Sequence, residues 1–184
     1  MKHATYSLAA TLIAAAPSAA VMAQQQPQRA AQQQLQQQPP QQATHTVRSL
    51  TPEAALRAAQ AALQSCARTG YQVAIAVSDR AGHPLVMLRD RLAGPHTPET
   101  AINKAYTAVT FKMDTLAFAR ATQANEASSG IRQLPRVVAI GGGLPIESAG
   151  ALVGGIGVSG APGGEADDVC ARAGVAAIKD DLDF

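Results

Sequence analysis

A glutamine-rich segment, residues 24–42, is the feature that most limits what this 184-residue chain can fold into. The segment is mostly Gln, and Pro27, Pro39 and Pro40 interrupt it. Such a composition offers too little apolar surface to offset the conformational entropy that a chain loses when it becomes ordered. We therefore expect residues 24–46 to be a disordered tether and residues 47–184 to form one folded domain.

The segment before the tether has the arrangement that is typical of a secretory signal peptide. Lys2 and His3 precede an apolar run over residues 8–16, and small residues close the segment at Ala23. This run is too short to cross a bilayer core of about 30 Å, and no later stretch is long and apolar enough. We predict that residues 1–23 are a signal peptide, that the protein is periplasmic or secreted, and that it has no membrane span.

Charge and aromatic content argue against a nucleic-acid partner. The formal net charge of the chain is only +2, and its basic residues are scattered rather than clustered. The chain also has no Trp, with three Tyr and three Phe, so it offers few side chains on which bases could stack. We expect no nucleic acid to bind, and we expect the domain core to consist mainly of Ala, Val, Leu and Ile.

Helix and strand signals follow one another in an order that is typical of an α+β domain. The patterns predict helices over residues 51–69, 97–113, 115–123 and 165–179, a hairpin of strands 72–78 and 85–89, and further strands over residues 137–140 and 151–159. The helical spacing of the first helix would place four residues on one buried stripe: Leu56, Ala59, Leu63 and Cys66. This order predicts a mostly antiparallel sheet with helices packed on it.

The two cysteines of the chain lie near opposite ends of two predicted helices. Cys66 is near the end of the first helix, and Cys170 is near the start of the last one. Antiparallel packing of these helices would bring the thiols together, and an exported protein meets an oxidising compartment. We expect a disulfide; the alternative is two buried thiols that act as small apolar side chains.

Two glycine-rich stretches, residues 141–145 and 154–160, lack the spacing of a phosphate-binding loop or a dinucleotide-binding fingerprint. Glycines there indicate strand breaks and close approach of two backbones. A weaker interpretation concerns Ser159, Gly160 and Gly164, which lead into the last predicted helix. Free N–H groups at that helix start could bind a small anion or a carboxylate.

His83 and His96 are the histidines of the domain that could ligate a metal ion. Neither belongs to an HxxxH or HExxH pattern, so a surface or turn position is the simpler interpretation. No Ser-His-Asp triad or carboxylate pair can be placed from spacing. Spacing alone therefore assigns no catalytic residue.

Five short motifs occur along the domain in a fixed order: Ser78–His83, Ala93–Pro95, Lys104–Ala108, Gly142–Ile146 and Gly154–Gly160. Together they resemble the GlcG/HbpS family of haem-binding proteins, over about residues 50–179. The resemblance implies an α+β fold whose five-stranded, mostly antiparallel sheet is flanked by helices in profilin-like layers. It also implies a homo-oligomer and, in secreted members, haem as the cofactor.

The resemblance implies roles for a set of polar residues, which we divide into iron ligands and charge partners. Haem iron would be held by an imidazole or, more weakly, by a hydroxyl, and the haem propionates by nearby cations. The predicted haem-binding residues are His96, Thr97, His83, Arg89, Lys104 and Thr107, of which His96, His83 and Thr97 are the predicted metal ligands. Lys104 could equally be a solvent-facing lysine of its helix.

Three functions remain open at this stage. The first is an exported haem-binding protein that acts in haem or iron sensing, storage or detoxification, with a sensor protein as a further partner. The second is a haem-degrading or peroxide-dependent enzyme. The third is a non-haem oligomeric module that binds a small molecule such as a 2-hydroxy acid. Because aromatic side chains are few, we expect any haem site to be shallow and exchangeable.

Overall fold

A computed structural model describes residues 43–182 of the chain. The chain divides into two units, residues 1–46 and 47–184, and the helices and strands of the described residues all belong to the second unit. The predicted signal peptide and most of the predicted tether lie outside the described residues. Residues 43–46 are exposed and belong to no helix or strand.

The predicted boundaries of the first helix of the domain, α2, are confirmed, but the predicted stripe of buried residues is wrong in part. It spans Pro52–Arg68, and the Ala54 N–H donates a hydrogen bond to the Thr51 hydroxyl at its N-cap. Ala59 and Cys66 are fully buried, but Leu56 is 40% exposed. The buried face of α2 is made of alanines because α5 (Gly164–Ala176) lies against it: a Cβ on Gly174 would come within 2.7 Å of the Ala58 carbonyl oxygen. A leucine has no room at this interface.

The sheet has four strands, not the expected five. The strands are β1 (Ala74–Asp79), β2 (Pro84–Arg89), β3 (Gly143–Ser148) and β4 (Ala151–Ser159), and they pair in the order β2-β1-β4-β3. All three pairings are antiparallel, as predicted, and β1 with β2 forms the predicted hairpin. The α+β class is therefore confirmed and the strand number is corrected.

The predicted strand over residues 137–140 is wrong, and the strand begins later, at Gly143. Arg136 has a φ of 68°, which interrupts an extended backbone just before this segment. The Val138 N–H then donates to the Thr107 hydroxyl at 2.9 Å instead of to a neighbouring strand. The segment is thus held against a helix, and the sheet lacks a strand at this place.

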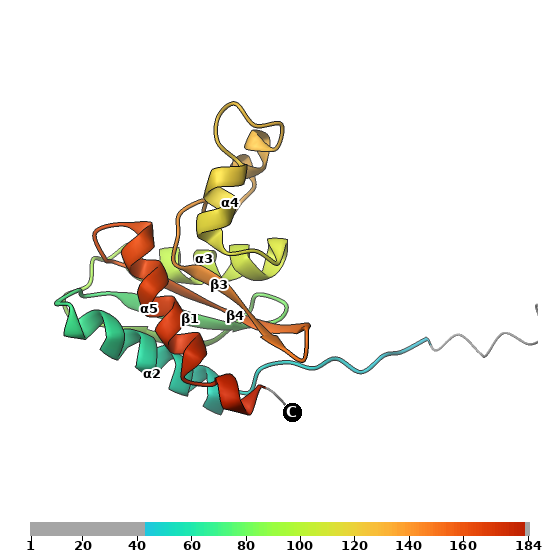
Figure 1. The fold of residues 1–184 in the computed structure, drawn as a ribbon, viewed down its shortest axis with the longest axis horizontal. Coiled ribbons are helices and arrows are strands. Elements are labelled where there is room, and N and C mark those ends of the chain that lie inside the picture. Colours follow the sequence, from blue (N-terminus) through green and yellow to red (C-terminus); the bar gives the residue numbers. More distant parts are fainter. Residues whose placement is uncertain (1–42, 183–184) are drawn as a thin grey trace, which may run out of the picture. The chain divides into compact units, whose positions relative to one another are not determined.

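Helices cover both faces of the sheet (Figure 1). The remaining helical elements are α3 (Thr97–Phe111), α4 (Thr115–Ala121), and the 3₁₀ turns η1 (Ser129–Gln133) and η2 (Lys179–Asp181). Side chains of β1 and β4, such as Ile75 and Ile156, point into the main core with α2 and α5. On the opposite face, Ala74 and Ala76 pack against Ala101 of α3. Helix α4 extends away from these layers (Figure 1).

The glycines of β4 allow α3 to lie directly on the strand. A Cβ on Gly155 would lie 2.7 Å from the Val109 side chain and 3.0 Å from the Ala105 carbonyl oxygen. A Cβ on Gly157 would overlap the Ala101 carbonyl oxygen, which belongs to the helix backbone and cannot move alone. This geometry supports the interpretation of the second glycine-rich stretch as a site of close backbone approach.

We predict that Gly157→Ala lowers the free energy of unfolding by about 3 kcal/mol, the upper part of the range for overpacked cores. The added methyl must push α3 off the sheet, because the atoms that it meets are backbone. Urea denaturation followed by circular dichroism measures the change. Gly130→Ala is the matched control, since a Cβ there meets nothing within 4 Å. Equal stability of the two variants would contradict the close packing.

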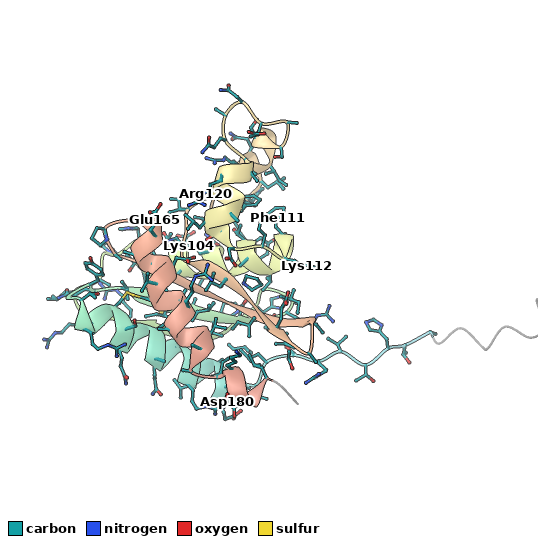
Figure 2. The ribbon with its side chains drawn as sticks, viewed as in Figure 1. Lys104, Phe111, Lys112, Arg120, Glu165 and Asp180 are labelled. Carbon is teal, nitrogen blue, oxygen red and sulfur yellow. A yellow bond between two sulfur atoms is a disulfide. The ribbon has the colours of Figure 1, made fainter. Side chains whose placement is uncertain are left out.

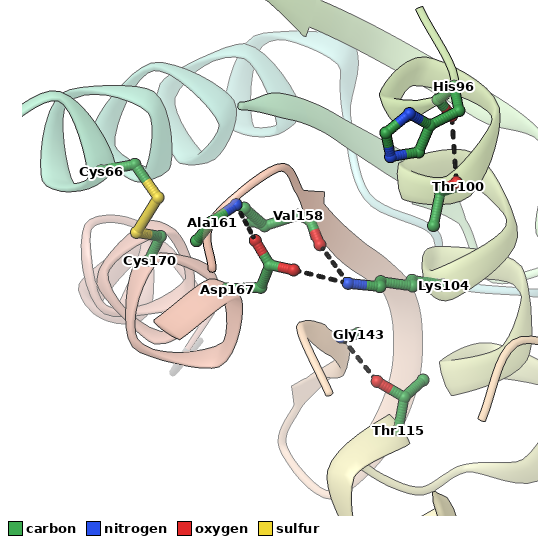
Figure 3. Close-up of polar contacts among 10 residues, drawn as sticks. All are labelled: Cys66, His96, Thr100, Lys104, Thr115, Gly143, Val158, Ala161, Asp167 and Cys170. Carbon is green, nitrogen blue, oxygen red and sulfur yellow. Dashed lines mark hydrogen bonds and ion pairs between the residues drawn. A yellow bond between two sulfur atoms is a disulfide. The ribbon is translucent and has the colours of Figure 1, made fainter. Parts of the chain in front are cut away.

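The expected disulfide is present between α2 and α5. Cys66 and Cys170 are bonded, with a Cα–Cα distance of 5.5 Å, and both residues are buried. The two helices run antiparallel, as the prediction required, and the bond joins the C-terminal part of α2 to the middle of α5 (Figure 3). The bond therefore closes a loop of 104 residues.

Among residues 43–182, none of the helices combines the length and the apolar character that a membrane span requires.

Candidate functional site

The N-terminal ends of α3 and α5 border one cleft with a volume of about 440 Å³. Helix α3 starts after Gly94, whose carbonyl accepts a hydrogen bond from the Thr97 hydroxyl at 2.8 Å. Helix α5 starts after Gly163, whose extended backbone leads the chain from β4 into the helix. Since a helix carries partial positive charge at its N-terminus, both ends favour a negatively charged group in the cleft.

A buried ion pair lies at the base of this cleft. The Lys104 ammonium donates to Asp167 Oδ2 at 2.7 Å and to the Val158 carbonyl at 2.9 Å. The other carboxylate oxygen of Asp167 accepts the Ala161 N–H at 3.0 Å. Figure 3 shows these contacts joining α3, β4 and the start of α5. Lys104 is 1% exposed, so the interpretation of this residue as a solvent-facing lysine is wrong.

Burial acts on both members of the pair against their charged forms. It lowers the pKa of the Lys104 amine, while the nearby Asp167 carboxylate partly offsets the effect. Burial likewise raises the pKa of the Asp167 carboxyl, and the Lys104 charge opposes that shift. Each group therefore depends on the other to stay ionised.

The first glycine-rich stretch encloses the ion pair. Gly142 has a φ of 106°, and a Cβ there would lie 2.6 Å from the Asp167 Cβ and 2.7 Å from the Val158 carbonyl oxygen. Only glycine allows the chain to pass so close at this backbone conformation. The stretch thus shields the ion pair, a role that concerns packing and not a nucleotide.

The structure brings together six of the residues that the sequence proposed for binding. His96, Thr97, Lys104, Ser159, Gly160 and Gly164 all line the cleft. His96 is the N-cap residue of α3 and its imidazole is exposed at the mouth of the cleft, whereas Thr97 is buried. Three of the six predicted haem-binding residues and the three predicted anion-binding residues therefore line the same cleft.

The other three predicted residues lie elsewhere. His83 follows the turn after β1, with Nδ1 3.4 Å from Asp79 Oδ2. Arg89 ends β2, and its guanidinium donates to the Ala93 carbonyl. Thr107 is buried within α3 and donates its hydroxyl hydrogen to the Asn103 carbonyl at 2.7 Å. None of the three lines the cleft.

Asp167 is the residue of the cleft that sequence reasoning missed. Its place in the first turn of α5 marks it only as a carboxylate at the positive end of a helix. Its partner Lys104 is 63 residues away, and no periodic pattern links the two. The available signal was the lysine itself, which stands among apolar residues on the buried side of its helix.

No group of three or more His, Cys, Asp or Glu side chains within residues 43–182 is arranged to hold a metal ion. A bare metal ion thus has no ready set of ligands in this part of the chain. Haem iron has different needs, because the porphyrin supplies four nitrogen ligands and the protein adds only an axial one.

Comparisons with known proteins agree with the fold and with the motifs. The family model described as haem-degrading protein HbpS-like matches residues 50–176. The crystal structure of HbpS is 40% identical with a TM-score of 0.69, and the match covers 73% of this chain and 93% of that one. A crystal structure of a PduOC–haem complex is 30% identical with a TM-score of 0.67, covering 71% of this chain and 95% of that one.

One curated relative matches as well. A 15.0 kDa protein of Citrobacter freundii, encoded in the dhaT-dhaS intergenic region, is 32% identical over 116 residues. The match covers 62% of this chain and 82% of the relative.

Proposed function

Because this chain belongs to the HbpS-like family of haem-degrading proteins, we propose that it binds haem at the cleft between α3 and α5. The observation that carries the proposal is the exposed His96 imidazole at the mouth of a cleft bordered by two positive helix ends. Imidazole is a common axial ligand of haem iron, and helix N-termini favour carboxylates such as the haem propionates. The similarity to a haem-bound structure supports the same ligand.

The residues of the cleft fit the polar parts of haem. His96 would hold the iron, and the starts of α3 and α5 would face the propionates. Ile140, which is 53% exposed and lines the cleft, offers apolar surface to the porphyrin. A volume of about 440 Å³ is at the small end for ligand sites, so the macrocycle would lie largely across the mouth. Bound haem would supply a redox-active iron. Because the cleft is small and open, it would exchange the whole haem readily with solution.

We propose further that the protein acts outside the cytoplasm, in haem or iron sensing, storage or detoxification. The buried disulfide supports this location, since such bonds persist in oxidising compartments. Exposed apolar side chains, including Met87, Leu92 and Val169, support association into a homo-oligomer or with a sensor protein.

A haemin titration followed by optical absorption tests the proposal. We expect a saturable shift of the Soret band for the unaltered protein and a loss of at least about tenfold in affinity for His96→Ala, because the axial bond is removed. His83→Ala is the matched control and should bind haemin as the unaltered protein does, since His83 lies outside the cleft.

The other outcomes separate the alternatives. If only His83→Ala loses haemin affinity, the axial ligand is the histidine that follows the turn after β1. If both variants bind haemin as the unaltered protein does, a hydroxyl ligand such as Thr97 is favoured. Absence of saturable binding would end the haem proposal. If the Soret band instead decays with release of iron after peroxide or a reductant is added, the protein is a haem-degrading enzyme.

A further inference from the structure

Ser159 is a buried polar residue that lines the cleft. It is the last residue of β4 and is 5% exposed. Side chains alternate along a strand, so Ser159 lies on the same face as Gly157, toward the first turn of α3. Within residues 43–182 its hydroxyl makes no hydrogen bond, and it lines the cleft. Among residues 43–182 the Ser159 hydroxyl is not one of the side-chain atoms that are both fully enclosed and unpaired, so it opens to the cleft and is available to a ligand there.

The helix ends that border the cleft are also without side-chain caps. Neither His96 at α3 nor Gly163 at α5 makes a capping hydrogen bond through a side chain. At the start of α5 the Ala166 and Asp167 N–H groups donate to the Gly163 carbonyl, and within residues 43–182 those of Gly164 and Glu165 have no acceptor. The start of α3 offers less, because Thr97 donates to the Gly94 carbonyl and Pro98 has no N–H. Asp167, which could have capped α5, instead accepts the Ala161 N–H and the Lys104 ammonium. The Ser159 hydroxyl and the first N–H groups of α5 are therefore donors at the cleft without an acceptor among residues 43–182.

The charges around the cleft limit what can enter it. The Lys104 charge is already neutralised by Asp167. Glu99 and Glu165 lie in the first turns of the two helices and are exposed. An anion in the cleft would therefore be attracted by the helix ends and the hydrogen-bond donors. The two glutamates disfavour a ligand with several negative charges. A single carboxylate group meets both conditions.

We propose that this cleft is a binding site for one carboxylate group, which accepts hydrogen bonds from the Ser159 hydroxyl and from N–H groups at the start of α5. The carboxylate belongs either to a small free organic acid or to a propionate of haem. The second source rests on the proposed function; the first does not.

Calorimetric titration with acetate and glycolate, at constant ionic strength, tests for the free acid. We expect saturable binding that Ser159→Ala weakens by at least about tenfold, because a hydrogen bond to a charged group is lost. Ser78→Ala is the matched control: Ser78 is a buried strand serine outside the cleft, and its hydroxyl already donates to the Gly155 carbonyl. Inorganic phosphate should bind more weakly than acetate, because of its higher charge.

Comparison of haemin with its dimethyl ester tests for the propionate. If the propionate is the ligand, the unaltered protein prefers haemin over the ester, and Ser159→Ala removes the preference. Binding of free acids without any binding of haemin would overturn the proposed function and leave the carboxylate site standing. The inference is overturned if Ser159→Ala changes neither the affinity for the free acids nor the preference for haemin over its dimethyl ester. This holds even if haemin binds through His96.

Discussion

Replacement of Lys104 by methionine is expected to lower the free energy of unfolding by about 3–5 kcal/mol, since one member of a buried ion pair is removed. The Lys104 and Asp167 side chains are only 2% and 5% exposed. Methionine fills much of the space of the lysine stem, so the loss reflects the charge and not a cavity. The Asp167 carboxylate would remain buried without its cation. Urea denaturation monitored by circular dichroism measures the change.

Lys112→Met is the matched control, because Lys112 is exposed at the C-terminal end of the same helix (Figure 2). Its effect should stay within about 0.5 kcal/mol, as for most surface substitutions. The double variant Lys104→Met with Asp167→Asn should lose less stability than the sum of the two single variants, because the uncompensated charge is then absent. The asparagine amide can still accept the Ala161 N–H. Additive losses would show that the two residues contribute independently.

The elements that sequence predicts well are those whose signals are local. Helix α2 has Thr51 as its N-cap and Gly70, with a φ of 79°, just after its end. The β1–β2 hairpin likewise follows from two apolar runs and the turn residues between them. Such signals act over a few residues, so they do not depend on how distant parts of the chain pack.

Strand β3 shows where local signals fail. Residues 137–140 have the stronger strand propensity, yet the strand is formed by Gly143–Ser148, which contains glycine and proline. A strand needs a partner. The chain reverses at Ala149 and Gly150, which both have positive φ, so that β4 pairs with Gly143–Ser148 and not with residues 137–140. Long-range pairing thus decides against propensity.

The site was predictable in part for the same reason. His96 and Thr97 could be placed at the start of a helix, and Gly164 near the start of another, from capping signals. That the two helix starts share one cleft depends on how α3 and α5 lie on opposite faces of the sheet. The partnership of Lys104 with Asp167 depends on the same packing. No residue spacing in the sequence records it.

Replacement of both cysteines by alanine is expected to lower the free energy of unfolding by about 4 kcal/mol, because a disulfide that closes a loop of roughly 100 residues restricts the unfolded chain. The loop between Cys66 and Cys170 is 104 residues long and includes the whole sheet. The native packing should change little, since alanine already dominates the buried face of α2. The midpoint of urea denaturation should therefore fall.

Reduction of the unaltered protein provides the matched comparison. A phosphine reductant should lower the stability of the unaltered protein to that of the double cysteine variant. The same reductant should not change the stability of the double variant. Thiol titration in denaturant should detect no free thiol before reduction and two afterwards, because the chain has two cysteines. Two reactive thiols in the protein as purified from an oxidising compartment would contradict the bond. They would also remove the support that it gives to an extracytoplasmic location, because the buried cysteines would then act only as small apolar side chains.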